Sequence, residues 1–171
     1  MLVKMGKYPK NGDDRKVSVR IDPHDAWSAY HSLALIIVPL LKMVKEKKQG
    51  SPFVDLEDVP EELRWTEEDH EYYKKNGTFS DKDKFHERWE WVLDQMIFSF
   101  EHYLNEDEND FQFWDEFPEI AEFKDTDNGT DNKELVWKTK GKYNEERAKI
   151  YYDRVQNGLN LFAKYYGSLW T

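Results

Sequence analysis

Cysteine is absent from this chain of 171 residues. Disulfide bonds, thiolate nucleophiles and zinc or iron–sulfur sites that need cysteine ligands are therefore excluded. The N-terminal residues lack the apolar core of a secretion signal, and the apolar run 33–44 is too short and too interrupted to span a bilayer. We expect a protein of a reducing compartment with no membrane segment.

An excess of basic residues is also missing, because 35 acidic residues outnumber 25 basic ones and the net charge is −10. Direct binding to nucleic acid through a basic surface is therefore not expected. The negative charge has two interpretations, which are ordinary solubility and an acidic face that imitates nucleic acid. Aromatic residues, in contrast, make up 16% of the chain. They fill protein cores and can also stack on bases and other flat ligands.

Established catalytic motifs are missing as well. The chain has no Gly-x-Ser-x-Gly elbow, no glycine-rich phosphate loop and no pair of Glu-x-x-His motifs. Four acids of one predicted helix could hold magnesium, as in helical nucleotide pyrophosphatases, but that chemistry needs matching acids on a second helix. These acids are Glu87, Glu90, Asp94 and Glu101. We expect a protein that is not an enzyme, without a metal or cofactor.

The longest apolar stretch, 27–48, repeats its apolar residues at helical intervals and is predicted to form the central helix. Asp22 and Pro23 are typical of a helix start, and Pro39 is expected to kink the helix. Its broad apolar face predicts burial on more than one side. Before it, the alternating segment 16–21 and residues 2–5 predict a β-hairpin.

Two further long helices are predicted at 81–104 and 144–166, where apolar residues again recur every three or four positions. Gly158 interrupts the last helix and indicates close packing against another helix. Residues 119–124 and 134–140 predict strands that pair across Asn128-Gly129. We therefore expect one domain, 1–171, of α+β and predominantly helical class. Three long helices would pack around the 25–48 helix, with small hairpins from 2–21 and 119–140.

Cations next to aromatic residues suggest a pocket for a small anionic ligand, because a cation can hold a phosphate while a ring stacks on a base. The candidate residues are Arg20, Trp27, Lys42, Arg88, Trp91, Arg154 and Lys164. The alternative is that Arg88 and Arg154 form ion pairs with Glu87, Asp94 or Asp153 and cover apolar surface. The acidic segment 105–127, which carries interleaved Phe and Trp, suggests a binding face for a basic partner or a solvated loop.

Three segments resemble an uncharacterised family of tailed-bacteriophage proteins. They are KVSVRIDPHDAWSAYHSLALIIVPLLKMVKEKKQGSPFVDLEDVPEELR (16–64), FHERWEWVLDQMIFSFE (85–101) and RVQNGLNLFAKYYGSLW (154–170). The opening LVKMGKY is similar to the start of longer members, which carry a Trp-rich insertion that is missing from this chain. The resemblance implies a phage origin and carries no catalytic residue.

We therefore expect a non-catalytic phage protein of the host cytoplasm that acts in counter-defence or host takeover. It would bind and sequester a small nucleotide-derived anion. The first alternative is an acidic protein–protein inhibitor of a host defence or transcription factor, and the second is a metal-dependent nucleotide hydrolase. The expected partners are a nucleotide-derived small molecule, a host protein or a second copy of the chain, but neither nucleic acid nor a membrane.

Overall fold

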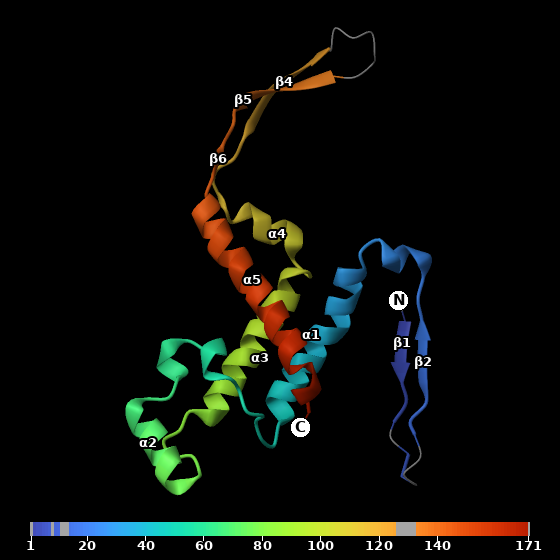
Figure 1. Ribbon diagram of the computed structural model, residues 1–171. Helices are drawn as coiled ribbons and strands as arrows, with labels where there is room; N and C mark the ends of the chain where they lie inside the picture. The colour runs from blue at the N-terminus through green and yellow to red at the C-terminus, as the bar shows by residue number, and fades with distance from the viewer. Residues whose placement is uncertain (1, 8, 11–13, 126–132, 171) are drawn as a thin grey trace. The chain divides into compact units, whose positions relative to one another are not determined.

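The computed structural model describes residues 2–7, 9–10, 14–125 and 133–170. Within them, five α-helices and three two-stranded antiparallel sheets form an α+β, mainly helical fold (Figure 1). The fold class predicted from the sequence is confirmed. The chain divides into a first compact unit, residues 1–93 with 167–171, and a second unit, residues 94–166. The single domain expected from the length stays a prediction.

Strands β1 (Leu2–Met5) and β2 (Val17–Arg20) form the predicted N-terminal hairpin of the first unit. Since side chains alternate between the faces of a strand, the register places four apolar side chains on one face: Val3, Met5, Val17 and Val19. Met5, Val17 and Val19 are 52%, 55% and 55% exposed. The opposite face carries Leu2, Lys4, Ser18 and Arg20, so polar and charged residues predominate on it and the hairpin is amphipathic.

The segment after the hairpin differs from the prediction of one helix that begins at Asp22. A 3-10 helix, η1 (Pro23–Ala26), comes first, and helix α1 (Ala29–Lys47) begins only after it. The carboxylate of Asp22 accepts the backbone N–H of His24 at 2.9 Å, and that of Asp25 accepts the N–H of Asp22 at 2.7 Å. These two bonds close a short turn. Trp27 therefore ends η1 and does not lie on α1.

Helix α1 continues through Pro39 to Lys47, but only Ala34, Val38 and Leu41 of it are buried. Four of its apolar side chains are about half exposed: Leu33, Leu35, Leu40 and Met43. The expected burial on more than one side is therefore wrong. Burial is concentrated on helix α3 (Phe85–His102), where Trp89, Val92, Leu93 and Met96 are fully buried. No helix in the described part of the chain has the length and hydrophobicity needed to cross a membrane.

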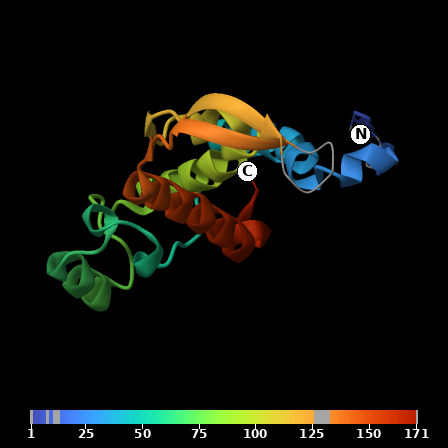
Figure 2. The ribbon, with the colours of Figure 1, turned by 90° about the horizontal axis from the view of Figure 1, so that it is seen from above.

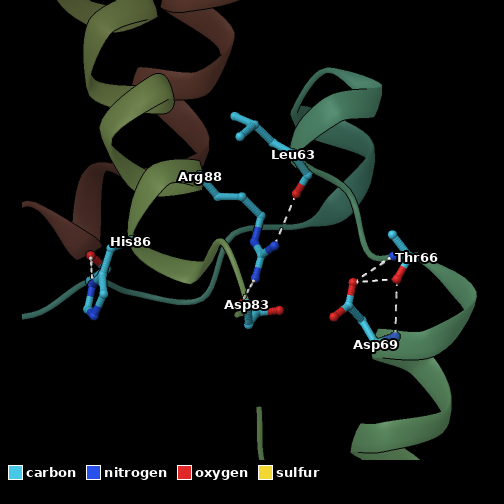
Figure 3. Close-up of polar contacts among 7 residues, drawn as sticks. Leu63, Thr66, Asp69, Asp83, His86 and Arg88 are labelled. Atoms are coloured by element: carbon cyan, nitrogen blue, oxygen red, sulfur yellow. Dashed lines mark hydrogen bonds and ion pairs between the residues drawn. The ribbon is translucent and has the colours of Figure 1, made fainter. Parts of the chain in front are cut away.

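Between α1 and α3 lie the 3-10 helices η2 (Leu56–Asp58) and η3 (Glu61–Leu63) and the helix α2 (Glu67–Asn76). Helix α2 was not predicted from the sequence, because residues 66–80 are polar and carry no apolar stripe. A capping box starts α2, because Thr66 and Asp69 bond each other's backbone N–H groups (Figure 3). Gly77 ends it in the left-handed conformation, with φ of 69°.

The second unit contains the C-terminal half of α3 and the helix α5, joined by small elements. These are α4 (Glu106–Phe111), β3 (Trp114–Glu116), β4 (Glu119–Asp125), β5 (Lys133–Thr139) and β6 (Lys142–Tyr143), before α5 (Glu145–Tyr165). The 3-10 helix η4 (Tyr166–Ser168) follows α5, and its last two residues are assigned to the first unit. Strands β4 and β5 pair antiparallel as predicted and form a twisted ribbon (Figure 2). The predicted turn at Asn128-Gly129 lies outside the described residues. Strands β3 and β6 form another pair, which the sequence did not indicate.

Helices α3 and α5 approach each other closely at Gly158. A Cβ atom added to Gly158 would lie 2.0 Å from Ser99 Oγ and 2.2 Å from the carbonyl oxygen of Gln95. Ser99 Oγ donates to the carbonyl oxygen of Val155 at 2.7 Å, a hydrogen bond that joins the two helices at the same point. The predicted close packing of Gly158 against another helix is therefore confirmed.

Candidate functional site

The residues proposed for an anion pocket lie on separate elements. Arg20, Trp27, Lys42, Arg88 and Trp91 belong to the first unit, and Arg154 and Lys164 belong to the second. Trp27 is 82% exposed and contacts His24 edge-to-face. Trp91 is half-buried, Arg20 and Lys42 are exposed, and Lys164 lies 5.6 Å from the ring of Tyr165. Their assembly into one site stays a prediction.

Two of these cations already make contacts that stabilise the fold. Figure 3 shows the guanidinium of Arg88 between Asp83, with which it forms an ion pair, and the carbonyl oxygen of Leu63, to which it donates at 3.0 Å. Arg154 donates to Gln95 Oε1 at 2.8 Å and lies 3.8 Å above the ring centre of Phe98. An ion pair was the predicted alternative for Arg88, but its partner is Asp83, which precedes the helix.

The acids considered for magnesium do not form a ligand cluster. Within the described residues, no three His, Asp or Glu side chains lie close enough together to hold a metal ion. Glu90 instead accepts a hydrogen bond from Lys48 Nζ at 2.8 Å, and this bond lowers the pKa of the Glu90 carboxyl. The metal-dependent hydrolase therefore has no support from the geometry of Glu87, Glu90, Asp94 and Glu101.

The acidic segment is folded through α4 and β3, against the start of α5, so this part is not a loop, although its acidic side chains are exposed to solvent. Phe113 is 1% exposed, and its carbonyl oxygen accepts the backbone N–H of Asn144 at 2.8 Å. Arg147 donates to the carbonyl oxygen of Gln112 at 2.6 Å and forms an ion pair with Asp115 at 3.2 Å. The carboxylates of α4 and β3 are therefore presented from a defined backbone.

Buried and exposed aromatic rings form the base and the rim of this region. Phe113 packs against the rings of Tyr151 and Tyr152, with centroids 5.2 and 5.7 Å apart. Phe111 and Phe117 remain 62% and 53% exposed, with their centroids 5.9 Å apart. We define the acidic–aromatic surface as the exposed residues Glu106, Glu108, Asp110, Phe111, Glu116 and Phe117. Clustered exposed rings of this kind mark binding sites more often than ordinary protein surface.

A cavity of about 600 Å³ opens on this surface and is lined by Glu106, Asp110, Phe111 and Tyr152. Tyr143 donates to Asp110 at 3.4 Å next to it. Burial raises the pKa of the Tyr152 phenol, and the charges of Asp110 and Glu106 raise it further. The same negative charges favour a bound cation, and an aromatic face adds to that attraction. The sequence indicated the acidic segment but not Tyr152, which comes from α5.

His102 is 5% exposed, and its ring lies edge-to-face against that of Tyr152, which lines the cavity, with centroids 5.5 Å apart. Its Nδ1 atom is 3.3 Å from the hydroxyl of Tyr151 and 3.4 Å from the amide nitrogen of Asn109. Burial lowers the pKa of the His102 imidazole, and the charge of Glu106 opposes that shift only in part. The folded protein therefore favours the neutral ring.

We expect this preference to make the protein less stable in mild acid. The pKa of His102 is lower in the folded than in the unfolded chain. The stabilisation of the folded state by this difference is therefore complete above about pH 6.5 and is lost as the pH falls below that value. Thermal melts from neutral to mildly acidic pH should show a shallower loss of stability in His102→Gln. The control is His70→Gln, which changes an exposed ring. An equal flattening in both variants would contradict the prediction.

A comparison of the chain with protein-family models, curated proteins and solved structures gave no match. The resemblance to phage proteins therefore stays a prediction. Any function has to follow from the residues of the site.

Proposed function

We propose that this chain is a non-catalytic binding protein that takes a basic segment of a protein partner on its acidic–aromatic surface. The observation that carries the proposal is the cavity in which Glu106 and Asp110 lie beside the rings of Phe111 and Tyr152. Two carboxylates supply charge and hydrogen-bond acceptors, and two rings supply cation–π contact. A lysine or arginine side chain has the matching chemistry at its end and an apolar stem for the exposed rings.

The composition of the surrounding segment supports a protein partner. Residues 105–127 contain ten acidic residues and one basic residue, together with five Phe and Trp. The negative electrostatic potential of this segment attracts a basic segment at long range and repels nucleic acid. With the phage resemblance, the expected partner is a host protein, and a defence or transcription factor would suit an inhibitor of this kind.

Binding to a defined basic probe tests the proposal. We expect a fluorescein-labelled oligo-arginine peptide to bind the wild-type protein in fluorescence anisotropy, with an affinity that falls as salt screens the charges. Glu106→Gln combined with Asp110→Asn should weaken binding about tenfold, and Phe111→Ser alone should also weaken it. An uncharged peptide of the same length should not bind.

The matched control removes the same two charges elsewhere, through Glu57→Gln and Glu62→Gln, which change exposed side chains of the first unit. This control should bind the peptide within about twofold of wild type, because the cavity is unchanged. Equal weakening of both double variants would show that only the net charge of −10 attracts the peptide, and the proposed site would be wrong.

Sequestration of a nucleotide-derived anion stays a second proposal and has less support. Of its seven proposed residues, Arg88 is buried in an ion pair and Arg154 is bonded to Gln95 and stacked on Phe98. Calorimetric titration with cyclic oligonucleotides and ADP-ribose-type compounds tests it directly. Absence of heat across that panel would leave the basic protein partner as the remaining function.

A further inference from the structure

The N-terminal hairpin β1–β2 is a basic ribbon in an otherwise acidic protein. Residues 1–21 contain six basic and two acidic residues, a net charge of +4, whereas the whole chain carries −10. Lys4 and Arg20 are exposed on the polar face, and Lys16 precedes β2 on the same side by alternation. The apolar face is also exposed, so this ribbon presents positive charge and apolar surface at once.

The unpaired edges and the exposed apolar face of this hairpin both favour binding to another protein surface. It is a two-stranded sheet, so both of its strands are edges with unpaired backbone groups. Two-stranded hairpins are marginally stable in water unless a further strand or a packed face supports them. Met5, Val17 and Val19 remain more than half exposed, so covering the apolar face of the hairpin would lower the free energy.

The acidic–aromatic surface is complementary to this ribbon in both respects. Its carboxylates Glu108 and Glu116 match the cations of the hairpin, and its exposed rings Phe111 and Phe117 match the apolar side chains. Every copy of the chain therefore carries both the hairpin and the surface that is complementary to it. At high protein concentration, a second copy is available to form this contact.

We propose that the β1–β2 hairpin of one copy docks on the acidic–aromatic surface of a second copy, so that the protein self-associates. This inference rests on the proposed function in one respect, since it assigns an occupant to the same surface. A reciprocal exchange of hairpins gives two identical contacts and a closed dimer. Self-association then competes with the basic partner, and only dissociated copies expose the cavity.

Nucleic acid is the other polymer that a basic ribbon could attract, and two observations argue against it. The net charge of −10 repels phosphates at long range, and the apolar face of the hairpin has no counterpart on a phosphate backbone. An acidic surface with exposed rings satisfies both faces of the hairpin.

The molar mass in solution tests the inference through charge reversal. Light scattering coupled to gel filtration should show a mass that rises with concentration from 20.7 kDa toward twice that value, and that falls back in high salt. Lys4→Glu with Arg20→Glu should weaken the association about tenfold or more, and so should Glu108→Lys with Glu116→Lys. All four substitutions together should restore association, because attraction is regained with the signs exchanged.

The controls separate this inference from instability and from the proposed function. Lys74→Glu with Lys75→Glu, on exposed positions of α2, makes the same charge change and should leave the association intact. Lys4 and Arg20 keep like charges after reversal, so the hairpin pairing is not altered, and an unchanged melting temperature confirms the fold. A monomer at all concentrations, or no rescue in the fourfold variant, overturns the inference. If such a monomer still binds the oligo-arginine peptide, the proposed function stands without it.

Discussion

Gly158→Ala is expected to lower the free energy of unfolding by about 3 kcal/mol, although alanine is the better helix former. The new methyl group would lie 2.0 Å from Ser99 Oγ and 2.2 Å from the Gln95 carbonyl oxygen. The second of these atoms is backbone, so α3 and α5 have to move apart and the bond from Ser99 to Val155 is strained. A drop in melting temperature of about 6–12 °C should follow for a chain of this size.

The neighbouring residue provides the control for this substitution. Asn157 is exposed on α5, so Asn157→Ala should keep or slightly raise the stability through helix propensity alone. Chemical denaturation of both variants measures the difference in unfolding free energy. If Gly158→Ala were as stable as Asn157→Ala, the close approach of the two helices would be wrong.

Asp83→Ala is expected to lower the free energy of unfolding by about 3–5 kcal/mol, because it leaves the charge of Arg88 buried without its carboxylate. The side chains of Arg88 and Asp83 are only 3% and 4% exposed. The hydrogen bond from Arg88 to Leu63 holds η3 near α3, so the loss should also loosen this segment. Denaturant unfolding gives the first quantity, and amide exchange at residues 61–64 gives the second.

An exposed ion pair shows how much of this effect depends on burial. Lys149 and Asp153 pair on the surface of α5, with side chains 74% and 65% exposed, so Asp153→Ala should cost at most about 0.5 kcal/mol. Replacing both buried partners, through Asp83→Leu with Arg88→Met, should be less harmful than Asp83→Ala alone. A double variant worse than the single one would mean that Arg88 stabilises the fold through more than its charge.

Long periodic segments allowed much of the fold to be predicted. The apolar repeats of α1, α3 and α5 are strong signals, and the alternation in Val17–Arg20 marks a strand directly. Helix α2 was missed because it has no apolar stripe, although Thr66 and Asp69 had the spacing of a capping box. The predicted burial of α1 on more than one side was wrong, because hydrophobicity shows that a segment can be buried but not that other elements cover it.

The site was less predictable, for reasons that concern particular residues. The partner of Arg88 is Asp83, which lies in the turn before α3, so helical spacing could not identify it. The cavity combines Phe111 of α4 with Tyr152 of α5, and the chain between these helices includes the strands β3 and β6, whose pairing the sequence did not indicate. Acidic residues interleaved with rings favoured a loop in the sequence, whereas burial of Phe113 holds the segment in place.

Helix α3 has a consequence for how the chain melts. Its 18 residues form one continuous helix, with one half in each compact unit on either side of the Leu93–Asp94 boundary. Helices shorter than about 12 residues are marginal in water on their own, so neither half persists once the other has lost its packing. Denaturation of either unit therefore removes a structural element of the other, and we expect a single cooperative transition in calorimetry. For the same reason, expressing the two units as separate fragments would divide a helix that each of them needs.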